Sequence, residues 1–580
     1  MKRRVEKVWV PPEPVTDAVN QNLAVYSSVE RQLLFNRGIT DPESAEKFLN
    51  AQQEVHDPFL LKDMETAVER VCQAISERQK VVVFGDYDVD GVTATVLLVQ
   101  VINRLGGRAE HYIPDRFEEG YGFSEAAIQG VLTLDPDMII TVDCGVRSIK
   151  EVDLMNAAGV DVIITDHHQP LDEFPHACAI INPKQAGDGY PFKGLAGVGL
   201  AYKLAQAVAS RFPDRGLIIE AWLDLVALGT IADLAPLRDE NRALVRLGLD
   251  CINQNKRPGI NALIAVSGIK PGKVRSDNIG FMLGPRLNAA GRLKTAENAY
   301  HLLKSETQEE AAPLALSLDS ENRERQTITK EIQLAVEIYA ESIDEELKKS
   351  LIFYYDEKFN EGVVGLAASR LAESYYRPSI VGAIKGDLIR ASCRSIPEID
   401  ITSALDECAD LLVKHGGHAM AAGLTIETRN AGAFYQRMVE IIQKELDGKE
   451  IQPKVFAGAE IDLLDLPPSL INFIARLEPT GMENPYPLLI SRDVTVDRVR
   501  PIGKEGDHLR FNVKKAAGKK GLDFKEVTYN AVAFNFGHLA DRLKDSDHVN
   551  ILYAYEVNEF NGNSSLQLNV RDIHLRTNNG

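Results

Sequence analysis

The stretch at residues 81–91 constrains the fold of this chain more than any other. Four apolar residues, three of them valine, predict a buried strand of the parallel-sheet kind. Asp86, Asp88 and Asp90 then follow in strict alternation, and the apolar run at 96–102 predicts a helix. Such a strand–loop–helix unit places its loop at the carboxyl edge of an open α/β sheet, where these folds bind ligands. Three crowded carboxylates repel one another and need a compensating charge, which hard divalent cations supply. An acidic turn with one helix cap is the alternative.

Three further apolar segments also end in carboxylates or histidines. Predicted strands at 138–142 and 162–165 end in Asp143 and in the triplet Asp166-His167-His168. A third apolar run, at 223–231, leads to Asp233. These side chains are therefore expected to form one cluster at one edge of a sheet. Imidazoles beside carboxylates favour a metal site over an acidic turn.

These residues and four other stretches resemble the RecJ family of single-strand-specific exonucleases, a branch of the DHH phosphoesterases. The four stretches are residues 114–122, 195–199, 284–292 and 414–419. The resemblance covers nearly the whole chain in the expected order. It implies a two-metal exonuclease that hydrolyses single-stranded DNA from the 5′ end in DNA recombination and repair. One departure is Asn360, which stands where RecJ proteins usually carry a histidine.

The resemblance assigns the cluster to two divalent ions, Mn²⁺ or Mg²⁺. Asp88 and Asp143 hold one ion, with Asp86 close by. The ligands of the second ion are Asp90, Asp143, His167 and Asp233, so Asp143 is the bridge. Mixed carboxylate and imidazole ligation suits these metals.

The other two members of the triplet are expected to act beside the metals. Asp166 orients a ligand histidine, because metal-bound imidazoles need a partner on the other nitrogen. His168 contacts the scissile phosphate or assists the leaving oxygen, although a structural histidine at a strand end remains open.

Substrate contacts are expected outside this cluster. Arg116 can bind a terminal phosphate bidentately and Tyr121 can stack on a base. Without the resemblance, Arg394 would be interpreted as a surface charge, and Gly416 and Gly417 as a turn. The resemblance implies a substrate-binding set of Arg116, Tyr121, Asn288, Arg292, Ser392, Arg394, Gly416, Gly417 and His418.

The chain of 580 residues is expected to contain five parts. Alternating strands and helices predict a doubly wound parallel sheet, and short turn-separated strands near the end predict an antiparallel barrel. By resemblance, these are a DHH domain and an OB-fold, with a DHH-associated α/β domain between them. The predicted parts are a helical lead-in (1–54), the DHH domain (55–294), a connecting helix (295–345), the DHH-associated domain (346–448) and the OB-fold (452–577).

The glycines at 194–199 have two interpretations. They can cradle a phosphate at a helix N-terminus, or they can permit tight packing between a strand and a helix. No G-K-[ST] follows them, so a nucleotide-binding P-loop is not supported.

A net charge of −19 argues against a protein coated by nucleic acid on all sides, so DNA contact requires a local groove. Residues 491–526 carry ten Lys/Arg against six Asp/Glu, which fits either a solvated face or a groove that follows the DNA backbone.

The remaining composition points to a cytoplasmic protein that does not bind membranes. The six cysteines form no C-x-x-C pair, so neither a zinc site nor a disulfide framework is indicated. No run is long enough to cross a bilayer, and the first residues lack the apolar core of a signal peptide. The resemblance further implies a monomer that works with a single-strand-binding protein and a RecQ-type helicase.

Two other functions remain open. A DHH-type phosphodiesterase of short oligonucleotides or cyclic dinucleotides shares the metal motifs but usually lacks the barrel and the loop that holds Arg116. The second alternative is a non-catalytic single-strand-binding scaffold built on a decayed site. The intact set of Asp88, Asp90, Asp143, His167 and Asp233 argues against it.

Overall fold

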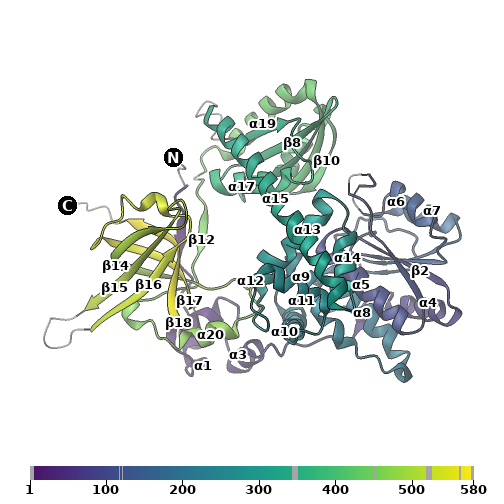
Figure 1. The fold of residues 1–580 in the computed structure, drawn as a ribbon, viewed down its shortest axis with the longest axis horizontal. Helices are drawn as coiled ribbons and strands as arrows, with labels where there is room; N and C mark the ends of the chain where they lie inside the picture. Colours follow the sequence, from purple (N-terminus) through teal and green to yellow (C-terminus); the bar gives the residue numbers. More distant parts are fainter. Residues whose placement is uncertain are drawn as a thin grey trace. The chain divides into compact units, whose positions relative to one another are not determined.

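The computed structural model describes residues 5–116, 118–120, 122–342, 350–449, 451–517, 525–560 and 563–575. The chain divides into two compact units (Figure 1). The first contains Val55–Pro453, and the second combines Lys7–Glu54 with the residues from Lys454 onward. Among the described residues, none of the helices has both the length and the apolar character needed to span a membrane.

The first unit contains a five-stranded sheet in which all strands are parallel. In spatial order, its strands are β3 (Arg108–Tyr112), β2 (Lys80–Gly85), β4 (Met138–Val142), β5 (Asp161–Thr165) and β6 (Ala179–Ile181). The chain runs from β2 outward to β3, and then returns to add β4, β5 and β6 on the other side. The order therefore reverses between β2 and β4, and this is the point at which such sheets bind ligands. The predicted doubly wound parallel sheet is confirmed.

Helices cover both faces of this sheet (Figure 1). Val81 and Val83 pack in one core with the first group of helices, whereas Val82 and Phe84 pack in a second core with the other group. The first group is α4 (Met64–Glu77), α5 (Val89–Arg104) and α8 (Gly197–Ser210), and the second is α6 (Glu125–Leu132) and α7 (Ile149–Ala157). Burial on both faces explains why the strand sequence is continuously apolar rather than alternating.

After β6 the chain becomes helical. The apolar run at 223–231 forms helix α9 (Leu223–Ala232), and every residue of that run is buried. It packs against α5 and against α10 (Asp239–Asn253). Asp233 is therefore presented by the end of a helix, although the three other acidic groups follow strands.

A long helix leads out of this domain. The predicted connecting segment contains α14 (Glu297–Lys304) and then α15 (Gln308–Ser342), which is 35 residues long. Ile332 and Val336 of α15 share an apolar core with α17 (Val364–Tyr375) of the next lobe. The connecting helix expected from the sequence is thus present.

The second lobe is built on a mixed five-stranded sheet, as predicted for a second α/β domain. Only β7 and β8 are parallel, and the other neighbouring pairs are antiparallel. The strands in spatial order are β10 (Leu412–His418), β11 (Ala421–Glu427), β9 (Leu388–Arg394), β8 (Ser379–Lys385) and β7 (Ile352–Asp356). Helix α19 (Ala431–Leu446) packs on one face of this sheet, and α17 packs on the other.

The second unit contains a closed five-stranded barrel. Its strands pair in the order β14 (Leu488–Ile502), β15 (His508–Ala517), β16 (Lys525–Ala533), β18 (Asn563–Leu575) and β17 (His548–Phe560). Pairing of β17 with β14 closes the ring, and β16–β18 is the parallel pair. This barrel confirms the predicted OB-fold.

Residues 7–54, expected as a lead-in, belong to the same unit as the barrel. Strand β1 (Val8–Val10) pairs with β12 (Lys454–Phe456). Three helices follow, and their apolar side chains share the core of the barrel domain. They are α1 (Asp17–Asn22), α2 (Ser28–Phe35) and α3 (Pro42–Leu49).

Candidate active site

The acidic loop lies at the carboxyl edge of the parallel sheet, between β2 and α5. Asp88 is the N-cap of α5, and its carboxylate accepts a hydrogen bond from the backbone N–H of Gly91 at 3.1 Å. A side chain at position 91 would place its Cβ 2.5 Å from the carbonyl oxygen of Asp86. The glycine therefore permits the tight loop that brings three carboxylates together.

The side chains predicted as metal ligands converge at this edge. Within each of three groups, the potential ligand atoms all lie within 4.8 Å of one another. The groups are Asp86, Asp88 and Asp143; Asp90, His167 and Asp233; and Asp143, His167 and His168. Asp143 Oδ1 is 3.0 Å from His167 Nε2, so the groups are continuous through this pair. The arrangement offers two adjacent positions for cations, with Asp143 beside both.

The buried polar atoms of this cluster fit a divalent cation. Asp143 Oδ1 and His167 Nε2 are both buried, and neither has a hydrogen-bond partner among the described residues. Burial without a partner is costly for such atoms, and a metal ion would satisfy both. Burial also lowers the pKa of His167 to about 3, which keeps its imidazole neutral and its lone pair available.

The carboxylates of the cluster cannot all be ionised without a counter-charge. Burial, followed by the charge of Asp88, raises the pKa of Asp86 to about 8. The same two causes raise the pKa of Asp233 to about 7. Burial and neighbouring carboxylates hold the pKa values of Asp90 and Asp143 well above their usual range. A divalent cation would remove this repulsion, so the cluster is a candidate divalent-metal centre.

The N-terminus of α8 positions Asp90. The backbone N–H groups of Gly197 and Val198 donate to its two carboxylate oxygens at 2.7 and 2.8 Å. A Cβ on Gly197 would lie 2.7 Å from that of Asp143. Of the two interpretations of the glycines at 194–199, tight packing therefore describes Gly197, and the helix N-terminus holds a carboxylate rather than a phosphate.

Asp166 is bonded to His168 rather than to His167, the histidine expected as a metal ligand. Its Oδ1 accepts the backbone N–H of His168 at 2.9 Å and lies 2.8 Å from Nδ1 of the same residue. Its Oδ2 accepts the N–H of Val146 at 2.9 Å. Burial opposes ionisation of both side chains, but this pair lowers the pKa of Asp166 and raises the pKa of His168. Asp166 therefore favours a protonated His168 at the edge of the metal centre.

Helix α13 (Gly284–Leu293) supports the acidic loop from one side. Asn288, predicted to contact substrate, accepts a hydrogen bond from the backbone N–H of Val89 at 3.2 Å. A Cβ on Gly291 would lie 2.8 Å from the carbonyl oxygen of Tyr87. In this structure the segment that contains Asn288 and Gly291 positions the loop and its carboxylates.

Four arginines are neighbours of one another, and two of them, Arg116 and Arg292, lie beside Tyr87 of the acidic loop. Burial, followed by neighbouring positive charges, lowers the pKa of Arg292 to about 10. These neighbours are Arg116, Arg325 and Arg394. The guanidinium of Arg116 also lies 5.1 Å from the centre of the Tyr87 ring, in the acidic loop. Neighbouring positive charges favour binding of an anion such as a phosphate.

The second lobe contributes Ser392 and Arg394 from β9. A Cβ on Gly365, in the first turn of α17, would come within 3.2 Å of Arg394 Nη2 and 3.3 Å of Ser392 Oγ. The strand register places Gly416 two strands from Ser392, and His418 two strands from Arg394. These residues and Gly417 are therefore at one end of the same sheet.

Tyr121 lies outside the described residues. Asn360 forms the turn before α17, where its side chain accepts the N–H of Gly362 at 2.8 Å and its carbonyl accepts that of Val363. This turn is the local role of Asn360, at the position for which the resemblance implied a histidine.

Two basic residues near the site are absent from the predicted set. The ammonium of Lys184 donates to the carbonyl oxygen of His167, and burial lowers the pKa of this lysine. It follows the short strand β6 by three residues, so its place at the same sheet edge could have identified it. Arg325 is in the middle of α15, and no local pattern distinguishes it from the other charged residues of that helix.

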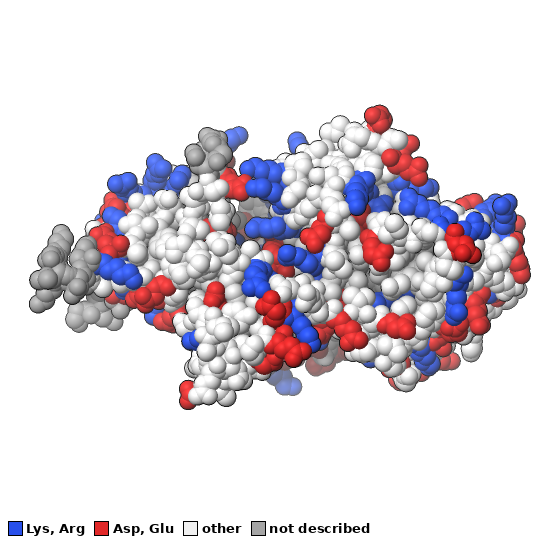
Figure 2. All heavy atoms as spheres, turned by 90° about the horizontal axis from the view of Figure 1, so that it is seen from below, with Lys and Arg blue, Asp and Glu red and all other residues white. Residues whose placement is uncertain are grey.

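The basic stretch of the barrel is partly neutralised by its own neighbours. Lys514 forms an ion pair with Asp497 at 2.5 Å. The ammonium of Lys515 donates to the carbonyl oxygen of Asp493 at 2.6 Å and lies 3.5 Å from its carboxylate. Lys519 and Lys520 fall outside the described residues. Figure 2 shows Lys and Arg side chains interspersed with Asp and Glu over the visible face, so basic residues do not cover it uniformly.

Comparison with known proteins agrees with this architecture. Three family models match the chain: the DHH family N-terminal domain at residues 80–230, the DHHA1 domain at 348–444 and the RecJ OB domain at 458–572.

Curated relatives match along most of the chain. The single-stranded-DNA-specific exonuclease RecJ of Bacillus subtilis is 38% identical over 548 residues, which cover 93% of this chain and 67% of that protein. The protein of the same name from Dickeya dadantii is 34% identical over 94% of this chain and 95% of its own length. The crystal structure of Thermus thermophilus RecJ in complex with Mn²⁺ superposes with a TM-score of 0.80 and 28% identity, and covers 100% of this chain and 80% of that one. The chain belongs to the RecJ family of DHH phosphoesterases.

Proposed function

We propose that this protein is a metal-dependent exonuclease that hydrolyses single-stranded DNA from the 5′ end. The observation that carries the proposal is the pair of adjacent metal-ligand groups around Asp143, with a cluster of arginines beside them. Relatives named single-stranded-DNA-specific exonucleases, at 34–38% identity over more than nine tenths of the chain, support the substrate. We further propose a role in DNA recombination and repair, which the resemblance to the RecJ family implies.

Two divalent ions, Mn²⁺ or Mg²⁺, are the proposed cofactors. When bound, such a pair activates water and neutralises the charge that develops on the attacking and leaving oxygens. The chain's own part is to hold the ligands rigidly. Asp90 is fixed by two backbone N–H groups of α8, Asp88 caps α5, and Asp143 joins the two groups.

His168 is proposed to act on the phosphate. Its hydrogen bond to Asp166 favours the protonated imidazole, and its side chain is 36% exposed, so a substrate can reach it. A protonated histidine in this place can donate a hydrogen bond to the scissile phosphate or a proton to the leaving oxygen.

The arginine cluster is proposed to bind the terminal phosphate. Arg292 and Arg394 come from the two lobes of the first unit, and both are largely buried. Guanidinium groups bind phosphate bidentately, so a terminal phosphate held there would position the adjacent phosphodiester at the metal centre. This arrangement supports removal of nucleotides from an end rather than cleavage within a strand. The barrel supports single-strand binding through its fold, since OB-folds commonly bind single strands.

The test is digestion of one oligonucleotide labelled at either end, with Mn²⁺ or Mg²⁺. We expect 5′ label to be released as a mononucleotide in the first turnovers, while 3′ label stays in long fragments. A blunt duplex of the same sequence should be degraded much more slowly. Early release of the 3′ label would refute the direction. Faster turnover of cyclic dinucleotides than of long strands would favour the phosphodiesterase alternative.

We also propose that the protein works as a cytoplasmic monomer, alongside a single-strand-binding protein and a RecQ-type helicase. The proposed substrate supports the two partners, because single strands in the cell are produced by unwinding and are covered by binding proteins. Co-purification with either partner from a nuclease-treated lysate would test the association.

A further inference from the structure

A second group of side chains that could hold a metal ion lies in the first unit and shares no residue with the candidate metal centre. It consists of His111 on the edge strand β3 and of Glu297 and His301 on α14. One nitrogen or oxygen of each lies within 4.8 Å of the others. His111 and Glu297 are 186 residues apart in sequence, so the fold has brought them together.

Two of the three separations between these atoms are close to those of ligands around one small cation. Glu297 Oε2 is 2.9 Å from His111 Nε2 and 3.3 Å from His301 Nε2. Ligands at about 2.0–2.1 Å from a tetrahedral zinc ion lie about 3.4 Å from one another. The two pairs that involve Glu297 therefore need shifts of about half an ångström or less, and the atoms of His111 and His301 lie within 4.8 Å of each other. A carboxylate that only bridges two imidazoles by hydrogen bonds is the competing description.

The three side chains are held in place before any ion binds. Glu297 and His301 are four residues apart on α14 and therefore share one helix face. The ring of His111 stacks on that of the fully buried Tyr300, with centroids 3.7 Å apart and planes inclined by 10°. Pre-positioned ligands reduce the entropy lost when a metal binds.

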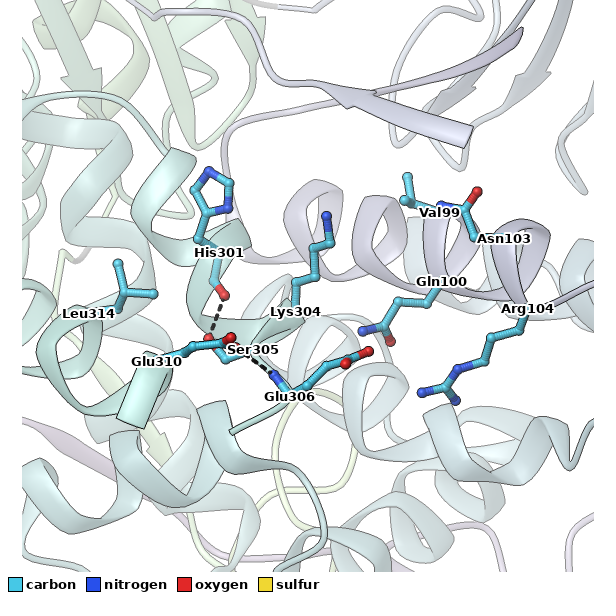
Figure 3. Close-up of a pocket in the computed structure, with 10 residues that line it drawn as sticks. All are labelled: Val99, Gln100, Asn103, Arg104, His301, Lys304, Ser305, Glu306, Glu310 and Leu314. Atoms are coloured by element: carbon cyan, nitrogen blue, oxygen red, sulfur yellow. Dashed lines mark hydrogen bonds between the residues drawn. The ribbon is translucent and has the colours of Figure 1, made fainter. Parts of the chain in front are cut away.

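The cluster is also accessible from solution. The side chains of His111, Glu297 and His301 are 22%, 40% and 51% exposed. His301 in addition lines a cavity of about 530 Å³, which has residues of α5 such as Asn103 on its other side (Figure 3). Because all three side chains are partly exposed, an ion can reach the cluster, and a water molecule can complete its coordination.

We propose that His111, Glu297 and His301 bind a divalent transition-metal ion of the zinc class, separate from the ions of the metal centre. Two imidazoles and one carboxylate form a donor set typical of Zn²⁺ with an open fourth position, whereas Mg²⁺ prefers oxygen ligands. The ion would join the edge strand β3 to α14, the helix that precedes the long connecting helix. The absence of C-x-x-C pairs gave no indication of such a site, because it uses no cysteine.

The test measures zinc retained per chain. The full-length protein is loaded with Zn²⁺, desalted and analysed by plasma emission spectrometry. His301→Gln should retain one equivalent less than the parent, and Glu297→Gln should lose the same equivalent. His176→Gln is the matched control, because His176 also pairs with a carboxylate, Asp153 at 2.9 Å, but belongs to none of the metal-capable groups of the described residues. It should retain as much zinc as the parent.

The same three variants are then made in an Asp143→Asn background, which lowers binding at the metal centre. The loss of one equivalent in His301→Gln should persist there. Zinc should also raise the thermal midpoint of the Asp143→Asn protein more than that of the protein that carries both Asp143→Asn and His301→Gln. Folding of each variant is checked by circular dichroism, and Glu297→Gln stands in if His301→Gln does not fold. Equal zinc content in folded Glu297→Gln and in the parent would overturn the proposal, and would leave the cluster as a hydrogen-bonded bridge.

Discussion

Asp86→Asn should stabilise the metal-free protein, and the gain should grow with pH. Burial and the charge of Asp88 raise the pKa of Asp86 from 3.8 to about 8. Between these values the folded protein keeps a proton that the unfolded chain has lost, so folding stability falls as pH rises. The stability that the protonated Asp86 carboxyl contributes to the folded state is fully present below about pH 4. It is lost as pH approaches about 8, where the carboxyl ionises in the folded state. Asparagine keeps the side-chain oxygen that accepts the N–H of Tyr87 and removes the acid.

The magnitude follows from the pH interval. Each pH unit between the two pKa values changes stability by about 1.4 kcal/mol, so the advantage of Asp86→Asn should widen by about 3 kcal/mol between pH 5 and pH 7. For a domain of 150–250 residues this corresponds to a rise in thermal midpoint of about 6–12 °C.

Metal should oppose this advantage. An ion that binds only the folded state at a hundred times its dissociation constant adds about 2.7 kcal/mol, and the variant has lost one candidate ligand. Saturating Mn²⁺ should therefore narrow or reverse the gap between the two proteins.

The assay is calorimetric unfolding at pH 5 and pH 7, with a chelator or with Mn²⁺. Asp172→Asn, which removes an exposed carboxylate, is the control and should show no pH-dependent gain. If the metal-free Asp86→Asn protein gains equally at both pH values, or gains nothing, carboxylate crowding does not destabilise the empty site and the reasoning fails.

Four further predictions concern activity and DNA binding. Asp143→Asn should abolish hydrolysis and reduce bound Mn²⁺. The circular dichroism spectrum should stay unchanged, because asparagine tolerates the backbone φ of 61° at this position. Near-native turnover with full metal content would contradict the shared-ligand assignment. Gly291→Ala should lower kcat at least tenfold, since its Cβ would push the acidic loop; the folded variant should show the loss at saturating substrate. Arg394→Gln should raise KM for 5′-phosphorylated strands about 10- to 100-fold and leave 5′-hydroxyl strands little changed, and equal effects on both would remove this arginine from phosphate binding. The double variant Lys514→Gln, Lys515→Gln should lower the slope of log DNA affinity against log salt concentration by less than roughly 0.7 per lysine, because both lysines are already paired with aspartates. The slope is measured by fluorescence anisotropy, and a full change of this size would show that DNA displaces these ion pairs.

The cluster of candidate metal ligands was largely predictable because most of these residues stand next to strand ends. Asp86 and Asp143 follow strands β2 and β4, which are neighbours in the sheet, and the triplet that contains His167 follows β5. Parallel strands with helical crossovers end at the same edge, so a local pattern of apolar run and polar residue predicts a common position in space.

The sequence was less informative about the type of secondary structure in fully buried segments and about which charged side chains are paired. The apolar run that leads to Asp233 is buried on all sides, and such a run has no periodicity that separates strand from helix. Only the tertiary structure, in which this run packs against α5 and α10, shows that a helix presents this candidate ligand. The basic stretch of the barrel is a similar case, since the sequence counts charges but does not show that Lys514 and Asp497 are paired across neighbouring strands.

By itself, the amino-acid sequence determined the order of domains, the strand ends and the types of ligand, because each depends on residues close together in the chain. The tertiary structure alone decided the contacts between distant segments. Gly197 donates to Asp90 over 107 positions, residues 7–54 join the core of a barrel that begins after residue 450, and His111 meets Glu297 on α14. Such contacts arise from the register and packing of whole elements, which leave no local periodicity in the sequence.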